Sequence, residues 1–289
     1  MASIQSLDHL LERRNGAAIL RRLRWIEDRL CWLGQFRRGD LVERFQVSPQ
    51  QASGDLAAFL EASGGGAVMD PSTKAYHPAP GHEWLFPKDA RRWIREETEA
   101  GARTLPVEEV RLPERRGRDD VVAALLRAHD SRTPVRMTYR SMSSSDTVSR
   151  VVSGHTLVDT GDRLHLRGWD GERRRFADFV LARIAEAWPE PGAVWVDGEA
   201  DTMWHETADV VLEAAPGLPP PQRAMVEAEY GMSGGRLRMP VRKALVTYVL
   251  DRLGLLPHPE DDGPQRRNLR IRCSNMGELR DFLPANVPR

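Results

Sequence analysis

The stretch RRGDLVERFQVSPQQASGDLAAFLEA, residues 37–62, decides the fold of the N-terminal part of the chain. Its apolar residues follow the three- and four-residue spacing of a buried helix face on both sides of a short break at Gln46-Val47. We therefore predict two short helices joined by a tight turn, with the first helix beginning near Gly39. This layout is typical of a helix-turn-helix that reads DNA.

The second predicted helix has a strong start signal. Ser48 can cap it with a side-chain oxygen, and Pro49 suits the first helical position because no backbone donor is needed there. Gln51 can complete a capping box with Ser48. One apolar stripe of this helix consists of Ala52, Leu56, Phe59 and Leu60.

The opposite, polar side of this helix is the predicted recognition face. Gln50 and Gln51 can each offer a donor and an acceptor to a base edge in the major groove, and Ser53 can contact a base or a phosphate. Gly54 costs about 0.5 to 1 kcal/mol relative to alanine inside a helix, and close approach to DNA would explain it. The alternative is an ordinary solvated helix face on which Gln51 only caps.

A glycine run and two short apolar segments follow this helix. Residues 64–66 are Gly-Gly-Gly, and AVMDPSTKAYHP, residues 67–78, predicts two strands around a turn at Asp70-Pro71. The sequence therefore predicts a winged helix-turn-helix whose Lys74, Arg37 and Arg38 hold phosphates. The full set of predicted DNA-binding residues is Arg37, Arg38, Ser48, Gln50, Gln51, Ser53 and Lys74.

Residues 16–35 precede this motif and predict a supporting helix with one broad apolar stripe. We expect the arginines of this helix to be solvated.

The charge balance of the chain limits its partners. Lys plus Arg and Asp plus Glu each number 42 in the 289 residues, and no segment is strongly basic. This balance argues against a non-specific nucleic-acid coat protein and favours specific DNA binding through locally placed arginines. The length suggests about two domains, each able to bury a core.

The sequence carries no sign of export, membrane insertion or metal binding. The N-terminal MASIQSLDHLLERR lacks the apolar run of a signal peptide, and no stretch approaches the ~18 apolar residues of a membrane span, so we expect a cytoplasmic protein. Cys31 and Cys273 are too few for a disulfide framework or a cysteine zinc site. His205 and Glu206 are adjacent and point apart, so we expect neither a metal site nor a cofactor.

The character of the chain changes twice after the predicted wing. Residues 78–118 are rich in proline and charge and predict a linker that contains one helix, about 87–101, followed by a helix at 119–129. From Val135 the apolar residues alternate in short runs, which predicts a small barrel or an open meander of strands.

One of these strands, residues 163–169, carries a line of cationic side chains. Arg163, His165 and Arg167 fall on one face, and Leu164 and Leu166 fall on the other. The cationic face could bind an anion such as a phosphate. The residues expected nearby are Tyr139, Ser141, Ser143, Ser144 and His155. The alternative is a solvated outer face of the barrel.

Three stretches resemble the WYL-domain transcriptional regulators, and closely the winged-helix repressors of that family linked to bacterial anti-phage defence operons such as BREX and CBASS. They are RLRWIEDRLCWLGQFRRGDLVERFQVSPQQASGDLAAFL, VRMTYRSMSSSD and GHTLVDTGDRLHLRGWDGERRRFADFVLARI. The tripeptide Leu164-His165-Leu166 keeps only the last residue of the motif that names the family. Ala177 stands where the defence-linked subgroup usually has arginine, and Gly154 stands where proline is usual. These departures bear on the ligand more than on the fold.

The resemblance implies a multidomain α+β protein. Its parts would be a winged helix-turn-helix DNA-binding domain at 1–86, a helical linker at 87–130, an Sm- or SH3-like WYL β-barrel that senses a ligand at 131–190, and a small α+β C-terminal dimerisation domain at 191–289. From the cationic strand face and the residues expected near it, we predict that the ligand-binding residues of this barrel are Tyr139, Ser141, Ser143, His155, His165, Arg167 and Arg183.

The function implied is that of a homodimeric repressor of an anti-phage defence operon. It would bind an inverted-repeat operator in double-stranded DNA and leave it when the barrel binds a nucleotide or a nucleic acid. The other interpretation is a family activator that responds to single-stranded DNA after DNA damage. An enzyme is a third class, but the sequence has no nucleophile elbow, phosphate-cradling glycine loop or paired-carboxylate helix, so we expect no catalytic residues.

Overall fold

The computed structural model describes residues 15–101, 108, 110, 113, 115–141, 147–256 and 270–283. The chain divides into two compact units, Met1–Val110 and Arg111–Arg289. The N-terminal residues 1–14 and the predicted ligand residues Ser143 and Ser144 lie outside the described residues.

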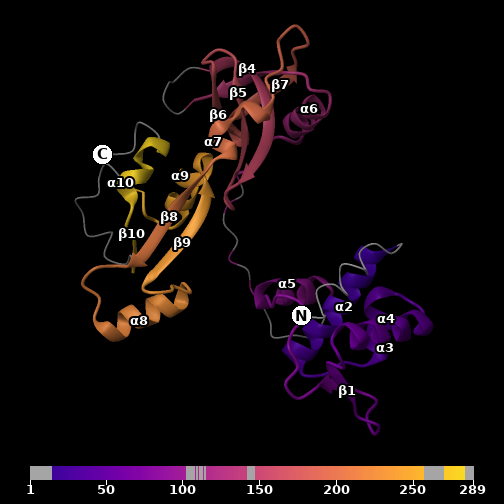
Figure 1. The fold of residues 1–289 in the computed structure, drawn as a ribbon. Helices are drawn as coiled ribbons and strands as arrows, with labels where there is room; N and C mark the ends of the chain where they lie inside the picture. Colours follow the sequence, from indigo (N-terminus) through magenta and orange to yellow (C-terminus); the bar gives the residue numbers. More distant parts are fainter. Residues whose placement is uncertain are drawn as a thin grey trace. The chain divides into compact units, whose positions relative to one another are not determined.

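The first unit is a winged helix-turn-helix built on the predicted helices (Figure 1). Its elements are α2 (Gly16–Leu33), α3 (Arg38–Phe45), α4 (Pro49–Ala62), β1 (Ala67–Met69), β2 (Tyr76–Pro78) and α5 (Ala90–Glu99). The turn between α3 and α4 is made by Gln46, which has a left-handed backbone at φ 51°. Leu41 and Phe59 are fully buried where α3 and α4 meet α2, so the predicted apolar stripes form the core of this unit.

The expectation that the arginines of α2 are solvated is wrong for Arg22. Arg22 and Asp28 are buried, and so is Glu27, which is completely shielded from solvent. Each has charged partners from another element, because a charge can be buried only when it is paired or hydrogen-bonded. Asp28 receives Lys88 and Arg92, and Glu27 accepts the backbone N–H groups of residues 85 and 86. These contacts hold the segment before α5, and α5 itself, against α2.

The second unit begins with α6 (Asp119–Asp130) and an antiparallel five-stranded sheet. The strands are β3 (Val135–Arg140), β4 (Thr147–Asp159), β5 (Leu164–Asp170), β6 (Arg175–Val180) and β7 (Ile184–Pro189), in the order β6-β5-β4-β3-β7. A 3-10 turn, Leu181–Arg183, separates β6 from β7. Helix α6 packs on β7, β4 and β3 and closes one side of the core (Figure 1).

The expected closed barrel is not confirmed. The described strands form an open sheet with β6 and β7 at its edges, and no ladder joins these two edges among the residues that the structure describes. The winged helix and the mixed helix and strand composition agree with the predicted α+β class.

The C-terminal part of the second unit is a three-stranded sheet with helices. Its strands are β8 (Thr207–Ala214), β9 (Arg236–Arg242) and β10 (Ile271–Cys273), in the order β10-β8-β9. The helices are α7 (Thr202–His205), α8 (Pro220–Glu229), α9 (Val246–Arg252) and α10 (Met276–Leu279). Val246 and Leu250 of α9 are fully buried in this core. No helix within the described ranges is long and apolar enough to cross a membrane.

Candidate functional site

The start of α4 is capped as its sequence predicts, with one difference. The side chain of Ser48 accepts the backbone N–H of Gln51 at 3.1 Å, and Pro49 occupies the first turn. The side chain of Gln51 does not complete the capping box, which would need its Oε1 to accept the backbone N–H of Ser48. Its Nε2 donates to Oδ1 of Asp55 at 3.0 Å, and this buried, charged acceptor four residues further along directs the Gln51 side chain along the helix.

The wing tip is ordered by Asp70. Its carboxylate accepts the backbone N–H and the hydroxyl of Ser72 and the hydroxyl of Thr73, and these hydrogen bonds lower the pKa of Asp70 to about 2. Lys74 follows in a left-handed conformation at φ 57°, and its backbone N–H donates to the carbonyl of Asp70. The backbone of Lys74 in the wing turn is therefore fixed by its neighbours.

Four of the predicted DNA-binding residues line one groove. Arg37, Arg38, Ser53 and Lys74 surround a cavity of about 890 Å³ between the start of α3, the middle of α4 and the wing. Arg37 Nε donates to the carbonyl of Thr73 at 3.3 Å, and Arg38 Nη1 donates to the hydroxyl of Ser53 at 3.0 Å. The groove lies between the wing and α4, and Arg37, Arg38 and Lys74 place three positive charges along it.

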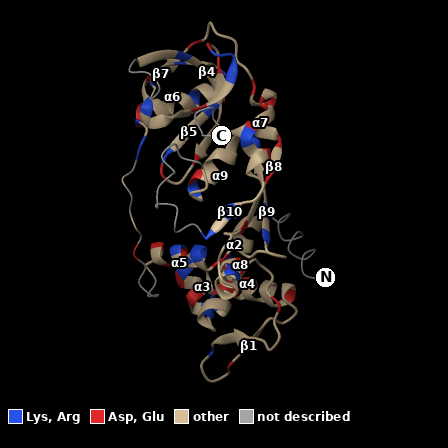
Figure 2. Ribbon diagram, turned by 90° about the vertical axis from the view of Figure 1, so that its left-hand side faces the viewer, with Lys and Arg blue, Asp and Glu red and all other residues tan. Residues whose placement is uncertain are grey.

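The remaining predicted DNA-binding residues lie at the N-terminal end of α4. Gln50, Ser48 and Gln51 are all exposed. Ser48 caps the helix and Gln51 donates to Asp55, as described above. Figure 2 shows basic and acidic residues mixed on α3 and α5, in keeping with the absence of a bulk positive charge.

Two of the three residues of the predicted cationic face, His165 and Arg167, are buried, so the solvated-face alternative is wrong for them, whereas Arg163 is partly exposed. His165 and Arg167 are only 6% and 5% exposed, and Leu164 is 37% exposed. Leu166 is buried on the other face, as expected. Strand β5 is covered on both faces because the C-terminal part of the unit packs over its polar side.

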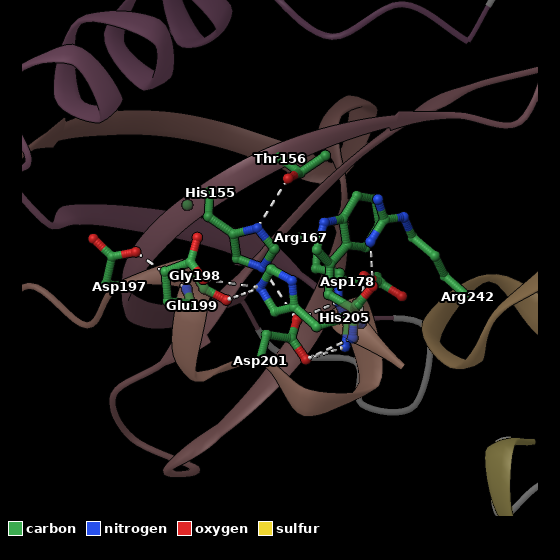
Figure 3. Close-up of polar contacts among 12 residues, drawn as sticks. His155, Thr156, Arg167, Asp178, Asp197, Gly198, Glu199, Asp201, His205 and Arg242 are labelled. Carbon is green, nitrogen blue, oxygen red and sulfur yellow. Dashed lines mark hydrogen bonds and ion pairs between the residues drawn. The ribbon is translucent and has the colours of Figure 1, made fainter. Parts of the chain in front are cut away.

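Arg167 is held by two carboxylates that sequence reasoning missed. Its Nε and Nη2 donate to Asp201 at 2.6 and 3.0 Å, and its Nη1 donates to Asp178 at 3.1 Å (Figure 3). Asp201 also caps α7 and contacts His155 Nε2 at 3.1 Å, and Asp178 accepts the hydroxyl of Tyr248 at 3.0 Å. We call His155, Arg167, Asp178, Asp201 and Tyr248 the junction cluster, since they join the five-stranded sheet to α7 and α9.

The charges of the junction cluster are set by burial and pairing. Burial opposes the charge on Arg167 and Asp201, but their mutual hydrogen bonds and charges prevail, so the pKa of Arg167 is raised and that of Asp201 is lowered. Burial lowers the pKa of His155 and of His165 and keeps both rings neutral near pH 7. His165 therefore adds no positive charge, contrary to the expectation of a cationic cluster.

The other predicted ligand residues are spread around the sheet. The hydroxyl of Tyr139 accepts the backbone N–H of Val180 at 3.3 Å, and its ring packs edge-on against Phe179. Arg183 is partly exposed in the 3-10 turn, and its charge helps lower the pKa of His165 after the larger effect of burial. Ser141 ends the described part of its segment and is half-buried. The structure thus brings His155 and Arg167 together through Asp201.

The partners of Arg167 were beyond sequence reasoning for a physical reason. Asp201 lies 34 residues from Arg167, and Asp178 faces Arg167 only through the register of β5 and β6. One signal was available, because the aspartate in Asp201-Thr-Met-Trp is well placed to cap a short helix.

We predict that acid weakens the second unit through these histidines. Their folded-state pKa values lie below the ordinary value of about 6.5, so the unfolded chain binds more protons as the pH falls. Stability should be full above about pH 6.5 and should fall as the pH drops from there toward the folded-state pKa values. Urea unfolding at pH 7.5, 6.5 and 5.5 measures this dependence.

The variant His165→Phe should flatten the acid dependence, since it removes one titrating ring from a buried position beside Tyr248. An unchanged slope between pH 7.5 and 5.5 in this variant would show that protonation of His165 is not coupled to unfolding.

Within the described part of the chain, no group of three or more His, Cys, Asp or Glu side chains could hold a metal ion. Cys31 and Cys273 are free thiols, and burial raises the pKa of both.

Three family models match the chain in order. Residues 18–90 match the BrxR transcriptional regulator winged helix-turn-helix domain, and residues 120–189 match the WYL domain. Residues 207–279 match the BrxR transcriptional regulator C-terminal dimerization domain. The groove lies within the first match, and the junction cluster spans the second match and the segments after it.

Curated relatives align along nearly the whole chain. It is 30% identical over 275 residues to the DNA-binding transcriptional repressor CapW of Pseudomonas aeruginosa, and 30% identical to CapW of Stenotrophomonas maltophilia. Each alignment covers 91% of both proteins. Among solved structures, Proteasome accessory factor B/C (PafBC) of Arthrobacter aurescens aligns at 14% identity with a TM-score of 0.27, over 92% of this chain and 47% of that one. This chain therefore spans about half the length of PafBC, and so loose an overlap supports no argument.

Proposed function

Because the chain belongs to the family of WYL-domain transcriptional repressors that includes BrxR and CapW, we propose that it is a homodimeric repressor of an anti-phage defence operon. The observation that carries this proposal is the ordered set of winged helix, WYL and dimerization segments, aligned with a repressor at 30% identity over 91% of the chain. In this proposal residues 1–86 bind DNA, 87–130 link, 131–190 sense a ligand, and 191–289 dimerise. No step of it requires catalysis.

The proposed DNA contact has two parts. The exposed start of α4 would enter the major groove with Gln50, while Arg37, Arg38 and Lys74 hold the backbone phosphates on either side of the groove they line. Gly54 is exposed, and a Cβ added there would meet no protein atom within 4 Å. Packing inside the unit therefore does not require a glycine at this position, which favours close approach of DNA as its reason.

A dimer of this chain would carry two recognition helices related by a two-fold axis. Such a dimer reads an inverted repeat whose half-sites lie about 10 base pairs, or a multiple of that, apart. Sequencing the DNA fragments selected by the purified full-length protein tests this proposal. Selection of a single asymmetric site, or of no sequence at all, would contradict it.

The sign of regulation is tested in cells. Deleting the gene should raise expression of a reporter placed behind the selected operator, whereas a fall in expression would indicate an activator. We propose that release occurs when an anionic nucleotide or nucleic acid binds the WYL segment. Such a ligand must bind the operator-free form more tightly, and a coupling of ~1 to 3 kcal/mol would weaken operator binding about 5- to 150-fold.

We predict that two substitutions separate base reading from phosphate contact. Gln50→Ala should cost about 1 to 3 kcal/mol on the selected operator and relax base preference at one position of each half-site. Lys74→Ala should weaken all DNA sequences alike and reduce the salt dependence of binding, because it removes a phosphate contact. Gel shifts on the operator and on scrambled DNA at two salt concentrations measure both effects.

Gln222→Ala is a matched control for Gln50→Ala, since Gln222 lies on α8 of the second unit. If Gln50→Ala kept full discrimination between operator and scrambled DNA, the exposed start of α4 would not be the recognition face.

A further inference from the structure

A small cavity borders the junction cluster and shares His155 with it. It has a volume of about 270 Å³ and lies between the end of α6, the middle of β4 and the segment 195–205, which includes α7. This volume is just below the roughly 300 to 1,000 Å³ of drug-sized ligand pockets. The space therefore suits a ligand about the size of one nucleoside.

The walls of this cavity are aromatic. Trp204 packs edge-on against His155 with ring centroids 5.7 Å apart, and Trp195 packs against His129 at 6.2 Å. His155 is fixed by Thr156 and Asp201 (Figure 3). His129 contacts the carbonyl of Gly154. Four aromatic rings on fixed supports give flat surfaces on which a planar heterocycle can stack.

Gly198 leaves space for the ring of His155 beside the cavity. A Cβ at Gly198 would lie 2.7 Å from a ring carbon of His155, so a larger residue there would push the histidine ring out of its place. Gly198 also accepts His205 Nε2 at 3.1 Å through its carbonyl, which holds a third histidine at the cavity.

A buried indole donor lies in the wall of the cavity. Among the described residues, the indole Nε1–H of Trp195 is shielded from solvent and makes no hydrogen bond of normal geometry. It is near Asp197, whose pKa is lowered chiefly by the backbone N–H of Glu199, with smaller effects from Arg132 and from this indole. A buried polar group without a partner is costly, and an acceptor on a bound ligand would satisfy it.

The rim carries charges of both signs. Arg132 pairs with Asp197 at 3.4 Å, and both side chains are exposed, as is Glu199. The carboxylates can accept the exocyclic amino group of a base, and Arg132 can reach a phosphate attached to it.

We propose that this cavity is a binding pocket for one nucleobase, which packs against the aromatic side chains of the wall and supplies the acceptor for the indole N–H of Trp195. The proposal rests on the ligand-controlled repressor function proposed above and assigns its ligand a place. A base in this pocket touches His155, which contacts Asp201, the main partner of Arg167. Occupation of the pocket would thereby change the contacts of Asp201 that join the five-stranded sheet to the C-terminal part of the second unit.

Isothermal titration calorimetry on the full-length protein tests the pocket directly. The probes are AMP, GMP, CMP and UMP, with ribose 5-phosphate and inorganic phosphate as probes that lack a base. At least one mononucleotide should bind with a dissociation constant below about 1 mM, a free energy of about 4 kcal/mol, and the probes without a base should not. A short single-stranded trinucleotide shows whether a free nucleotide or a strand end is preferred.

Trp195→Phe keeps an aromatic side chain but replaces the indole by a smaller phenyl ring without the N–H, so it should weaken binding about 3- to 10-fold. The matched control is Trp188→Phe, an exposed tryptophan on β7 that does not line the cavity and should leave binding unchanged. Circular dichroism confirms that both variants fold.

The pocket assignment is overturned if neither a mononucleotide nor the trinucleotide binds, or if Trp195→Phe binds them as the wild type does. Operator binding, measured by gel shift without any probe, reports separately on the repressor function. A protein that binds its operator but no base-bearing probe would retain the repressor role and lose only the pocket.

Discussion

Replacing Asp201 with alanine is expected to lower the free energy of unfolding of the second unit by about 3 to 5 kcal/mol. The substitution leaves the buried guanidinium of Arg167 with Asp178 alone and removes the carboxylate that His155 contacts. It also removes the side-chain cap of α7, where Asp201 accepts the backbone N–H of Trp204. For a unit of this size the expected fall in melting temperature is roughly 6 to 20 °C.

The matched control is Asp209→Ala. Asp209 forms an ion pair with Arg238 at 3.8 Å, but both side chains are more than half exposed, so its loss should cost no more than about 1 kcal/mol. Thermal unfolding of both variants, followed by circular dichroism, measures the difference. Equal melting temperatures for Asp201→Ala and the wild type would mean that the junction cluster does not stabilise the unit.

The burial of Arg167 changes how a ligand can act on this protein. An anion that approached Arg167 directly would have to displace two carboxylates that already hold it, and the pair with Asp201 alone contributes two short hydrogen bonds. Direct competition at this position is therefore costly. A ligand that moved His155 or the start of α7 would instead change the geometry of the pair from outside, without removing a buried charge from its partner.

Local signals in the sequence were enough to predict the winged helix. Ser48 and Pro49 start α4, the turn falls at Gln46, and Leu41 and Phe59 are buried where the helical spacing places them. Such features depend on neighbours within four residues, so one sequence can contain them in full.

The sequence was less informative where distant residues meet. The alternation in residues 163–169 correctly placed His165 and Arg167 on one face, but it could not show that α7 and α9 cover that face. The sequence favours a solvated Arg22 because charged residues on a helix usually face water, and its partner Asp55 lies 33 residues away. In both places the sequence could not predict the buried ion pair, because the two partners lie 33 or 34 residues apart and no regular spacing connects them.

The ion pair between Arg22 and Asp55 joins the recognition helix to the rest of the winged helix. Arg22 Nε and Nη2 donate to the two carboxylate oxygens at 2.6 and 3.0 Å, in the two-pronged geometry that makes arginine pairs strong. Asp55 also accepts Gln51 Nε2, so the same carboxylate orients a side chain at the exposed start of α4. One buried residue therefore controls both the attachment of the helix and part of its proposed recognition face.

Asp55→Ala is accordingly expected to cost the winged helix about 3 to 5 kcal/mol, because it leaves the buried Arg22 unpaired. Since a domain of this kind has only about 5 to 15 kcal/mol of stability, operator binding at 37 °C should fall steeply and should partly return near 15 °C, where stability is greatest. Gel shifts at the two temperatures measure this. The double variant Arg22→Met with Asp55→Leu removes both charges and should recover much of the lost stability. If the double variant were as unstable as Asp55→Ala, the loss would come from the missing contact with Gln51 and from packing, and the unpaired charge of Arg22 would not be its cause.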